Sequence, residues 1–331
     1  MKKTFIIGST GAMGSAVIHA LLKSEIEEHL IIAMTRDLES TQAQELEKMG
    51  EGRLRLVAAD LDDPASLRRA MKGADRVFCN TAFFSSGSIA GERRQGLDAL
   101  EVARELGVEH FVSSSLDPAS RLSGGRLPVP HYDSKASVEA DIDRFRSDEF
   151  MKQEDGFYTN NVSVIVTAPY IENFYDFFAP EDGTLSDGRQ GKIFRGPISG
   201  DGVWQMVALA DLGEFARIIL EDREKWGGRT LRIASEEKTM PQIVAEFEDF
   251  TGIASEFRPM SEQEFLASGL PHAHDPLNNM LIYREGYYVP RDFTLLRKLH
   301  PGLHSFTDWL RESGWRGEAR AMRKNAATGD I

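Results

Sequence analysis

Three glycines near the start of the chain, Gly8, Gly11 and Gly14, have the spacing of a loop that binds a pyrophosphate group. A strand-like apolar run precedes them, and an apolar helical pattern follows. In such a unit the first glycine allows a tight turn, the second lets the backbone approach a phosphate, and the third lets the helix pack close to the strand. The helix N-terminus offers free N–H groups to the phosphates. We therefore expect this loop, with Thr10 and Met13, to bind a dinucleotide cofactor.

Arg36 follows the second apolar run, residues 30–34, at the place where the adenosine ribose of such a cofactor would lie. An acidic residue there accepts hydrogen bonds from the ribose 2′-hydroxyl of NAD, whereas an arginine accommodates the 2′-phosphate of NADP. The fork of guanidinium donors suits a phosphate group. Asp37 comes one residue later, and it either caps a helix or favours NAD. We favour NADP(H) as the cofactor; the alternative is that Arg36 is only a solvated loop residue.

A second group of reactive side chains lies at residues 130–135, with the sequence PHYDSK. Short-chain dehydrogenases place a tyrosine four residues before a lysine there, so that both side chains share one face of a helix. The lysine holds the nicotinamide ribose and lowers the pKa of the tyrosine that donates a proton. Here His131 stands four residues before Lys135, and Tyr132 only three. We expect Lys135 to contact the cofactor. His131 and Tyr132 are candidate proton donors that could equally well only pack.

The elements that must position these residues alternate along the first half of the chain. Strand-like runs at residues 30–34, 54–59, 76–80 and 110–114 are separated by helical patterns. This alternation predicts an α/β fold with a doubly wound parallel sheet and right-handed crossovers.

The pattern is less regular in the second half. The polar residues 147–161 are interpreted as a surface insertion, and residues 180–203 as a loop or hairpin. Further strands are expected at residues 162–167 and 230–234, and Asp211 is interpreted as the cap of a helix between them. The remainder is predicted to be helical, with a frayed tail at residues 318–331.

Composition excludes several classes of protein. The net charge of −13 argues against direct binding of nucleic acid, and no apolar run is long enough to cross a membrane. The one cysteine, Cys79, fits a reducing compartment, so a cytoplasmic protein is expected, or a nuclear one if it regulates transcription in a eukaryote. His272, His274 and Asp275 resemble a metal cluster, but nothing supports convergent ligands, and we expect no metal site.

The chain resembles the NmrA-like family of atypical short-chain dehydrogenases, in the branch that contains an NADPH-sensing protein and fungal oxidoreductases. The similarity extends over nearly the whole chain, as far as Trp309. The residues that carry it are 8–14 (GSTGAMG), 35–36 (TR), 60–63 (DLDD), 95–96 (QG), 131–135 (HYDSK), 138–139 (VE) and 169–174 (PYIENF).

The resemblance implies a Rossmann domain at residues 1–168, with strands and a helix returning at 203–235. A smaller, mainly helical domain is implied at residues 169–202 and 236–317, with NADP(H) in the cleft between the two. It also implies contacts of Arg36 with the 2′-phosphate and of Lys135 with the nicotinamide ribose. Further residues are implied near the adenine (Asp60, Leu61), near the middle of the cofactor (Asn80, Ala82) and on the nicotinamide side (Tyr170, Asn173, Phe174).

Two functions are compatible with these residues. The first is a regulator that binds NADPH and NADP⁺ and responds to their ratio through a protein partner or a homodimer, with weak or no turnover. Its basis is an intact cofactor loop beside an altered proton-donor position. The second is an NADPH-dependent oxidoreductase that reduces a small carbonyl, imine or enone. An apolar cleft walled by Tyr170, Phe174 and Phe177 would then take the substrate.

Overall fold

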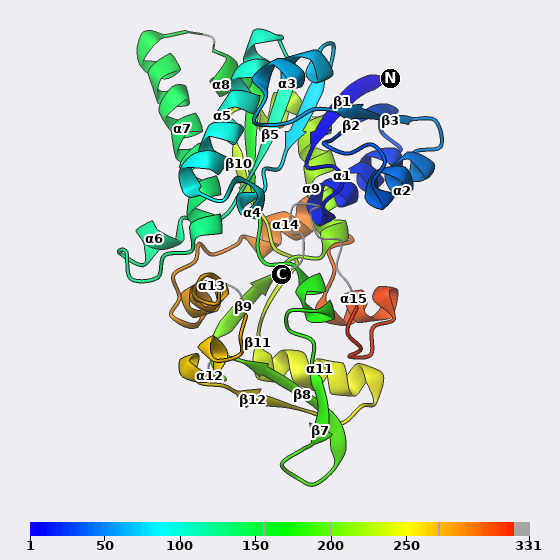
Figure 1. Ribbon diagram of the computed structural model, residues 1–331, viewed down its shortest axis with the longest axis vertical. Coiled ribbons are helices and arrows are strands. Elements are labelled where there is room, and N and C mark those ends of the chain that lie inside the picture. The colour runs from blue at the N-terminus through cyan, green and yellow to red at the C-terminus, as the bar shows by residue number, and fades with distance from the viewer. Residues whose placement is uncertain (155, 199, 271, 321–331) are drawn as a thin grey trace.

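The computed structural model describes residues 1–154, 156–198, 200–270 and 272–320. Its largest element is a sheet of seven strands whose neighbours all run parallel (Figure 1). In spatial order the strands are β10 (Thr230–Arg232), β6 (Val162–Val166), β5 (His110–Ser115), β4 (Arg76–Cys79), β1 (Lys2–Ile7), β2 (His29–Thr35) and β3 (Leu54–Ala58). The order reverses between β1 and β4, which confirms the predicted doubly wound sheet and places a ligand crevice at the carboxyl ends of these strands.

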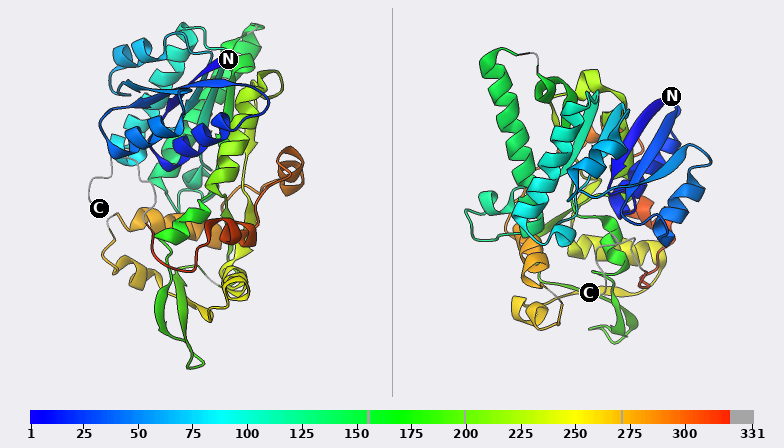
Figure 2. Two further views of the ribbon diagram at one scale, coloured as in Figure 1. Left: turned by 90° about the vertical axis from the view of Figure 1, so that its right-hand side faces the viewer. Right: turned by 45° about the horizontal axis from the view of Figure 1, so that its top comes forward.

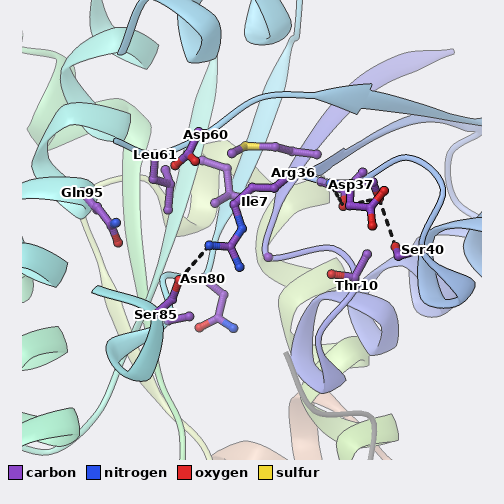
Figure 3. A pocket seen from close by; sticks show the side chains of 14 residues that line it. Ile7, Thr10, Arg36, Asp37, Ser40, Asp60, Leu61, Asn80, Ser85 and Gln95 are labelled. Carbon is purple, nitrogen blue, oxygen red and sulfur yellow. Dashed lines mark hydrogen bonds between the residues drawn. The ribbon is translucent and has the colours of Figure 1, made fainter. Parts of the chain in front are cut away.

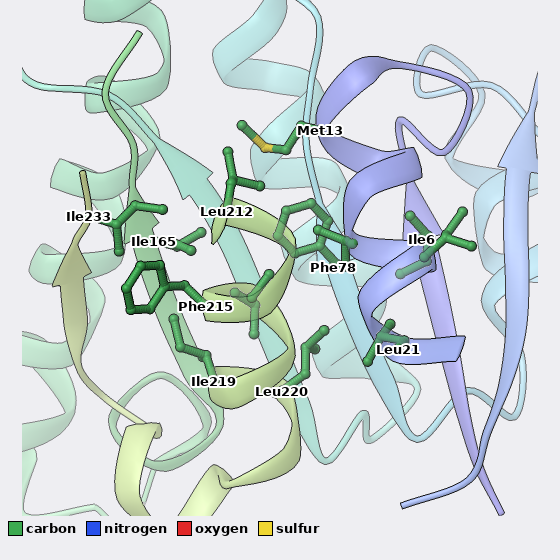
Figure 4. Close-up of a cluster of buried hydrophobic side chains, with 14 of the residues drawn as sticks. Ile6, Met13, Leu21, Phe78, Ile165, Leu212, Phe215, Ile219, Leu220 and Ile233 are labelled. Atoms are coloured by element: carbon green, nitrogen blue, oxygen red, sulfur yellow. The ribbon is translucent and has the colours of Figure 1, made fainter. Parts of the chain in front are cut away.

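Helices cover both faces of this sheet because successive strand residues point to opposite sides. Ile6 packs toward α1 (Ala12–Leu22) and α9 (Leu209–Glu221), whose inner side chains appear in Figure 4. Phe5 and Ile7 pack on the other face. The helices of that face are α3 (Pro64–Met71), α5 (Ile89–Glu105) and α7 (Pro130–Lys152).

Helices α1 and α9 pack with their backbones close together at Gly213. A Cβ atom at Gly213 of α9 would lie 2.4 Å from the carbonyl oxygen of Ala16 in α1. A side chain at Gly213 would therefore force the two helices apart. The position of α9 is thus fixed against the helix that follows the glycine loop.

A second cluster of elements lies below the sheet in Figure 1 and is seen from two other directions in Figure 2. It contains a three-stranded sheet in the order β12-β8-β7 and a strand pair β11-β9. Its elements are β7 (Glu181–Thr184), β8 (Gln190–Gly196), β9 (Val203–Met206), β11 (Glu236–Thr239), β12 (Ser255–Pro259), α11 (Met240–Thr251), α12 (Glu262–Leu266), α13 (His274–Arg284), α15 (Phe306–Ser313) and the 3₁₀ turn η1 (Ile171–Tyr175). An aromatic-rich core that includes Phe194, Trp204 and Trp315 holds them together.

The remaining helices of the described residues are short: α2 (Thr41–Met49), α4 (Phe83–Ser86), α6 (Ala119–Leu122), α8 (Phe157–Asn161), α10 (Arg223–Trp226) and α14 (Phe293–Leu299). Among the helices of the described ranges, none is both long enough and apolar enough to span a membrane. The limits of the smaller domain that the resemblance implied stay predictions.

The polar residues interpreted as a surface insertion, 147–161, are largely helical. Helix α7 continues to Lys152, and α8 begins at Phe157. The buried carboxylate of Glu149 accepts hydrogen bonds from the backbone N–H groups of Tyr158 at 3.0 Å and Thr159 at 2.8 Å. Glu149 thus satisfies the first turn of α8, so this polar sequence forms helix.

Asp211 does not cap α9, because that helix begins at Leu209, two residues earlier. The carboxylate of Glu172 accepts the Leu209 N–H at 3.2 Å instead. The C-terminal region also contains strands that were not predicted, β11 and β12, between its helices.

The prediction of a frayed tail is wrong for residues 318–320. The Arg320 N–H donates to the Tyr175 carbonyl at 2.7 Å, and the Trp315 indole donates to the Glu318 carbonyl at 2.8 Å. Residues 321–331 lie outside the described part of the chain.

Candidate functional site

The glycine loop joins β1 to α1 in the conformation that its spacing predicts. Gly8 has φ +77°, and a Cβ atom there would lie 2.5 Å from the Asn80 carbonyl oxygen. A Cβ atom at Gly14 would lie 2.1 Å from the Gly8 carbonyl oxygen, so only glycine lets the helix pack this close to the turn. Gly11 is the N-cap residue of α1. The side chain of Met13 is buried toward α9 (Figure 4), so Met13 can offer a ligand only its backbone.

A pocket of about 240 Å³ opens beside this loop, at the carboxyl ends of β1, β2 and β4. Its volume lies below the usual range for whole ligand pockets, so it fits one part of a dinucleotide. Seven predicted residues line it: Gly8, Thr10, Arg36, Asp60, Leu61, Asn80 and Ala82. Figure 3 labels five of them around the opening: Thr10, Arg36, Asp60, Leu61 and Asn80.

Arg36 extends across this pocket. Its Nη1 donates to the hydroxyl oxygen of Ser85 in α4 at 3.0 Å (Figure 3). Asp37 turns to its own loop, where Oδ1 accepts the Glu39 N–H at 2.9 Å. The guanidinium group is therefore the charged group that reaches over the pocket, while the neighbouring carboxylate is already engaged.

Sequence reasoning did not assign several residues of the pocket wall to the cofactor site, among them Ser40, Ser85 and Gln95. Gln95 is buried in α5, and its amide donates to the Asp62 carboxylate at 3.2 Å. It belongs to the QG pair that contributed to the resemblance, so a signal for it was present. The two serines carry no such signal, because serine is common in polar loops.

Lys135 contacts Asn80, one of the residues that line the pocket. Its ammonium group donates to the Asn80 Oδ1 at 3.2 Å and to the Thr81 carbonyl at 2.6 Å. Asn80 Oδ1 also accepts a bond from the Ser114 hydroxyl at 2.9 Å. Because both partners donate to the oxygen, the amide nitrogen of Asn80 is left to donate to a ligand.

Glu92 holds Lys135 in place, and sequence reasoning missed it. Its side chain is fully buried, and Oε1 lies 2.8 Å from the Lys135 ammonium. Thr81 donates to the same carboxylate at 2.7 Å, and Ser134 donates to its other oxygen. Burial opposes ionisation, but the charge of Lys135 and these hydrogen bonds outweigh it and lower the pKa of Glu92. The site therefore contains a buried ion pair rather than a lone lysine.

The two candidate proton donors occupy different surroundings. His131 opens α7 one turn before Lys135, is partly exposed, and has its Nδ1 2.5 Å from the Asp275 carboxylate of α13. Tyr132 is 2% exposed and packs in the aromatic core below the sheet. Burial raises the pKa of its phenol well above the ordinary value. The geometry favours His131 over Tyr132 for proton transfer.

The three residues implied on the nicotinamide side also lie in different surroundings. Phe174 is 1% exposed and packs against Phe306 and Trp315, within the lower core. Tyr170 is partly buried and packs against the core formed by α1 and α9. Asn173 is partly buried in η1. None of the three lines the described pocket, so their contact with a cofactor stays a prediction.

Cys79 ends β4 below this site and is 2% exposed. Burial raises the pKa of its thiol to about 12, although the nearby charge of Lys135 acts in the opposite direction. The thiolate form is scarce at neutral pH, which agrees with an inert core residue.

Comparison with known proteins identifies a family and relatives that match most of this chain. The model of the NmrA-like family matches residues 1–298. An NmrA-like family domain-containing oxidoreductase from Aspergillus hancockii is 29% identical over 282 residues, which cover 82% of this chain and 79% of the relative.

Solved structures show the same fold. NmrA, a negative transcriptional regulator, superposes with a TM-score of 0.75 at 19% identity and covers 94% of this chain and 95% of its own. The NADPH-dependent quinone oxidoreductase QOR2 from Escherichia coli, solved with NADPH, gives 0.70 at 22% identity and covers 94% of this chain and 100% of its own.

Proposed function

The chain belongs to the NmrA-like family, and on this premise we propose that it binds NADP(H) and responds to the redox state of the cofactor, with little turnover. The observation that carries the proposal is the position of Arg36, which spans a pocket beside an intact glycine loop. The relatives in the comparison include both a transcriptional regulator and oxidoreductases.

The residues present fit the cofactor. The tight turn at Gly8 leads into the N-terminus of α1, whose free N–H groups suit a phosphate. Arg36 and Ser85 offer donors for a 2′-phosphate, and Asn80 lines the same pocket. When bound, NADPH supplies a hydride. The chain supplies the binding groups, and the buried pair of Lys135 and Glu92 fixes a positive charge beside them.

Weak turnover is supported by the proton-donor position. Tyr132, the tyrosine nearest to Lys135 in the motif, is buried in an apolar core with a raised pKa. A phenol in that environment neither reaches the pocket nor gives up its proton readily. A protein with a complete cofactor site and no tyrosine acid is suited to report on cofactor state.

A second candidate is an NADPH-dependent oxidoreductase of a small carbonyl, imine or enone. It is favoured by His131, which lies one helical turn from Lys135 and has its Nδ1 2.5 Å from the Asp275 carboxylate. An imidazole at this position could pass a proton to a substrate. The names of QOR2 and of the Aspergillus relative support this candidate.

The first experiment is a calorimetric titration of the protein, stripped of bound nucleotide, with NADPH, NADP⁺, NADH and NAD⁺. We expect both phosphorylated forms to bind more tightly than the others. Arg36→Ala should weaken them about 10- to 100-fold, because a charged hydrogen bond is worth about 1.5–3 kcal/mol. The matched control is Arg69→Ala, an exposed arginine outside the pocket. Preference for NADH, or no effect of Arg36→Ala, would contradict the assignment.

The same titration separates the two candidates. A cofactor-responsive regulator requires different affinities or different conformations with NADPH and NADP⁺, because a ligand shifts an equilibrium only through differential affinity. Equal affinities with identical hydrogen-exchange patterns would refute the regulator. Turnover of a carbonyl, imine or enone that disappears in both Lys135→Ala and His131→Ala would establish the oxidoreductase.

A further inference from the structure

Two histidines converge on one buried carboxylate away from the cofactor pocket. Asp211, in the first turn of α9, is fully buried. Its Oδ1 lies 2.9 Å from Nε2 of His300 and 2.6 Å from Nδ1 of His304. Its Oδ2 accepts the backbone N–H of His304 at 3.2 Å and the hydroxyl of Ser235. One carboxylate oxygen is therefore anchored by the chain, and the other faces two imidazole nitrogens.

These three groups have the composition and placement of a metal ligand set. The ligand atoms all lie within 4.8 Å of one another. At Zn–ligand distances of roughly 2.0–2.1 Å, tetrahedral ligand atoms lie about 3.3 Å apart. The distances from Asp211 Oδ1 to His300 and His304, 2.9 and 2.6 Å, are within about 0.4 and 0.7 Å of this value. Both histidines lie between α14 and α15 rather than inside a helix.

A further carboxylate completes the pattern behind one histidine. Oε2 of Glu312 lies 2.9 Å from Nε2 of His304, the ring nitrogen that faces away from Asp211. Histidines that bind metals commonly donate this second N–H to a carboxylate, which fixes the ring and raises its basicity. His300 and His304 are 17% and 12% exposed, so solvent reaches the edge of the cluster and can supply a fourth ligand.

The cluster also favours added positive charge. Within the described ranges, no lysine or arginine forms an ion pair with Asp211. A divalent cation bound between the two imidazoles would balance the buried charge of Asp211.

We propose that Asp211, His300 and His304 bind a divalent transition metal of the zinc class. Two histidines and one carboxylate with an open position suit zinc and its neighbours rather than calcium or magnesium. The metal would fasten the segment between α14 and α15 to the N-terminus of α9. The site is independent of the proposed cofactor function.

The experiment uses the full chain without an affinity tag, treated with a chelator and then titrated with Zn²⁺ by calorimetry and with Co²⁺ by visible absorption. We expect one ion per chain, and d–d bands of a four- or five-coordinate Co²⁺ that Zn²⁺ displaces. His300→Ala, which removes a partly exposed ligand, should weaken binding more than 100-fold. Glu312→Gln leaves every ligand in place and should weaken binding about 10- to 100-fold.

The matched control is the double variant His272→Ala/His274→Ala, which removes two exposed histidines of α13 and the turn before it. Its metal binding should equal that of the wild type. The proposal is overturned if the wild type binds neither ion, if binding is unchanged in His300→Ala, or if it is lost in the control. Glu312→Gln keeps the test decisive even where removal of a ligand prevents folding.

Discussion

Glu172 joins three parts of the molecule and gives a measurable pH dependence. Its carboxylate accepts hydrogen bonds from the Leu209 N–H of α9 at 3.2 Å and from the Trp309 indole of α15 at 3.1 Å. Burial raises the pKa of Glu172 from 4.5 to about 7, and the nearby charge of Asp211 adds to the shift. The folded protein thus holds Glu172 protonated at a pH where the unfolded chain ionises it.

The sign and size of the effect follow from this difference. Below about pH 4.5 the group is protonated in both states. As the pH rises toward 7, only the unfolded chain loses the proton, so the free energy of unfolding falls. The difference between a pKa of 4.5 in the unfolded chain and one of about 7 in the folded protein corresponds to a total loss of about 3 kcal/mol above pH 7.

Glu172→Gln tests this account, because glutamine stays neutral at every pH and can still accept a hydrogen bond. We expect the variant to match the wild type at pH 5 and to exceed its free energy of unfolding by up to about 3 kcal/mol at pH 8. The assay is urea denaturation with a chelator present, and the quantity compared is the difference between variant and wild type at each pH. Glu181→Gln, at an exposed glutamate of β7, is the control. A difference that does not change between pH 5 and pH 8 would refute the reasoning.

Three further substitutions test close contacts inside the protein. Gly14→Ala adds a Cβ atom 2.1 Å from a backbone oxygen and should cost about 1–3 kcal/mol in urea denaturation, with loss of nucleotide binding by calorimetry. Glu92→Gln leaves the Lys135 ammonium without its carboxylate and should lower the free energy of unfolding by about 3–5 kcal/mol, whereas equal stability would mean that the pair is unimportant. Arg291→Met leaves the carboxylate of Asp117, 1% exposed and 3.0 Å away, without a counter-ion; a similar loss is expected, partly recovered in the double variant with Asp117→Asn.

The sheet and the glycine loop could be predicted because their signals are local. Each of the strands β1, β2 and β5 is marked by one short apolar run. The spacing of Gly8 and Gly14 likewise reflects a single turn between a strand and a helix. Arg36 could be placed at the pocket for the same reason, because it directly follows the strand β2, whose carboxyl end faces the pocket.

Groups that meet across the fold could not be found in this way. Glu92 lies in a helix with many charged residues, and only the packing of α5 against α7 brings it to Lys135, 43 residues away. Asp211 has the residue type of a cap, but His300 and His304 approach it from a segment about 90 residues later. The helical structure of the polar residues 147–161 was not predicted, because Glu149 satisfies the first turn of the next helix, a contact that composition does not reveal.

The buried thiol of Cys79 makes the protein suitable for distance measurements by fluorescence. It is the one cysteine in the sequence, and its high pKa and burial leave it unreactive toward maleimide dyes in the folded state. Dyes could therefore be attached to two introduced surface cysteines, one on α3 and one on α12, without replacing Cys79. Energy transfer between them would report the separation of the parallel sheet and the lower cluster of elements for each nucleotide added.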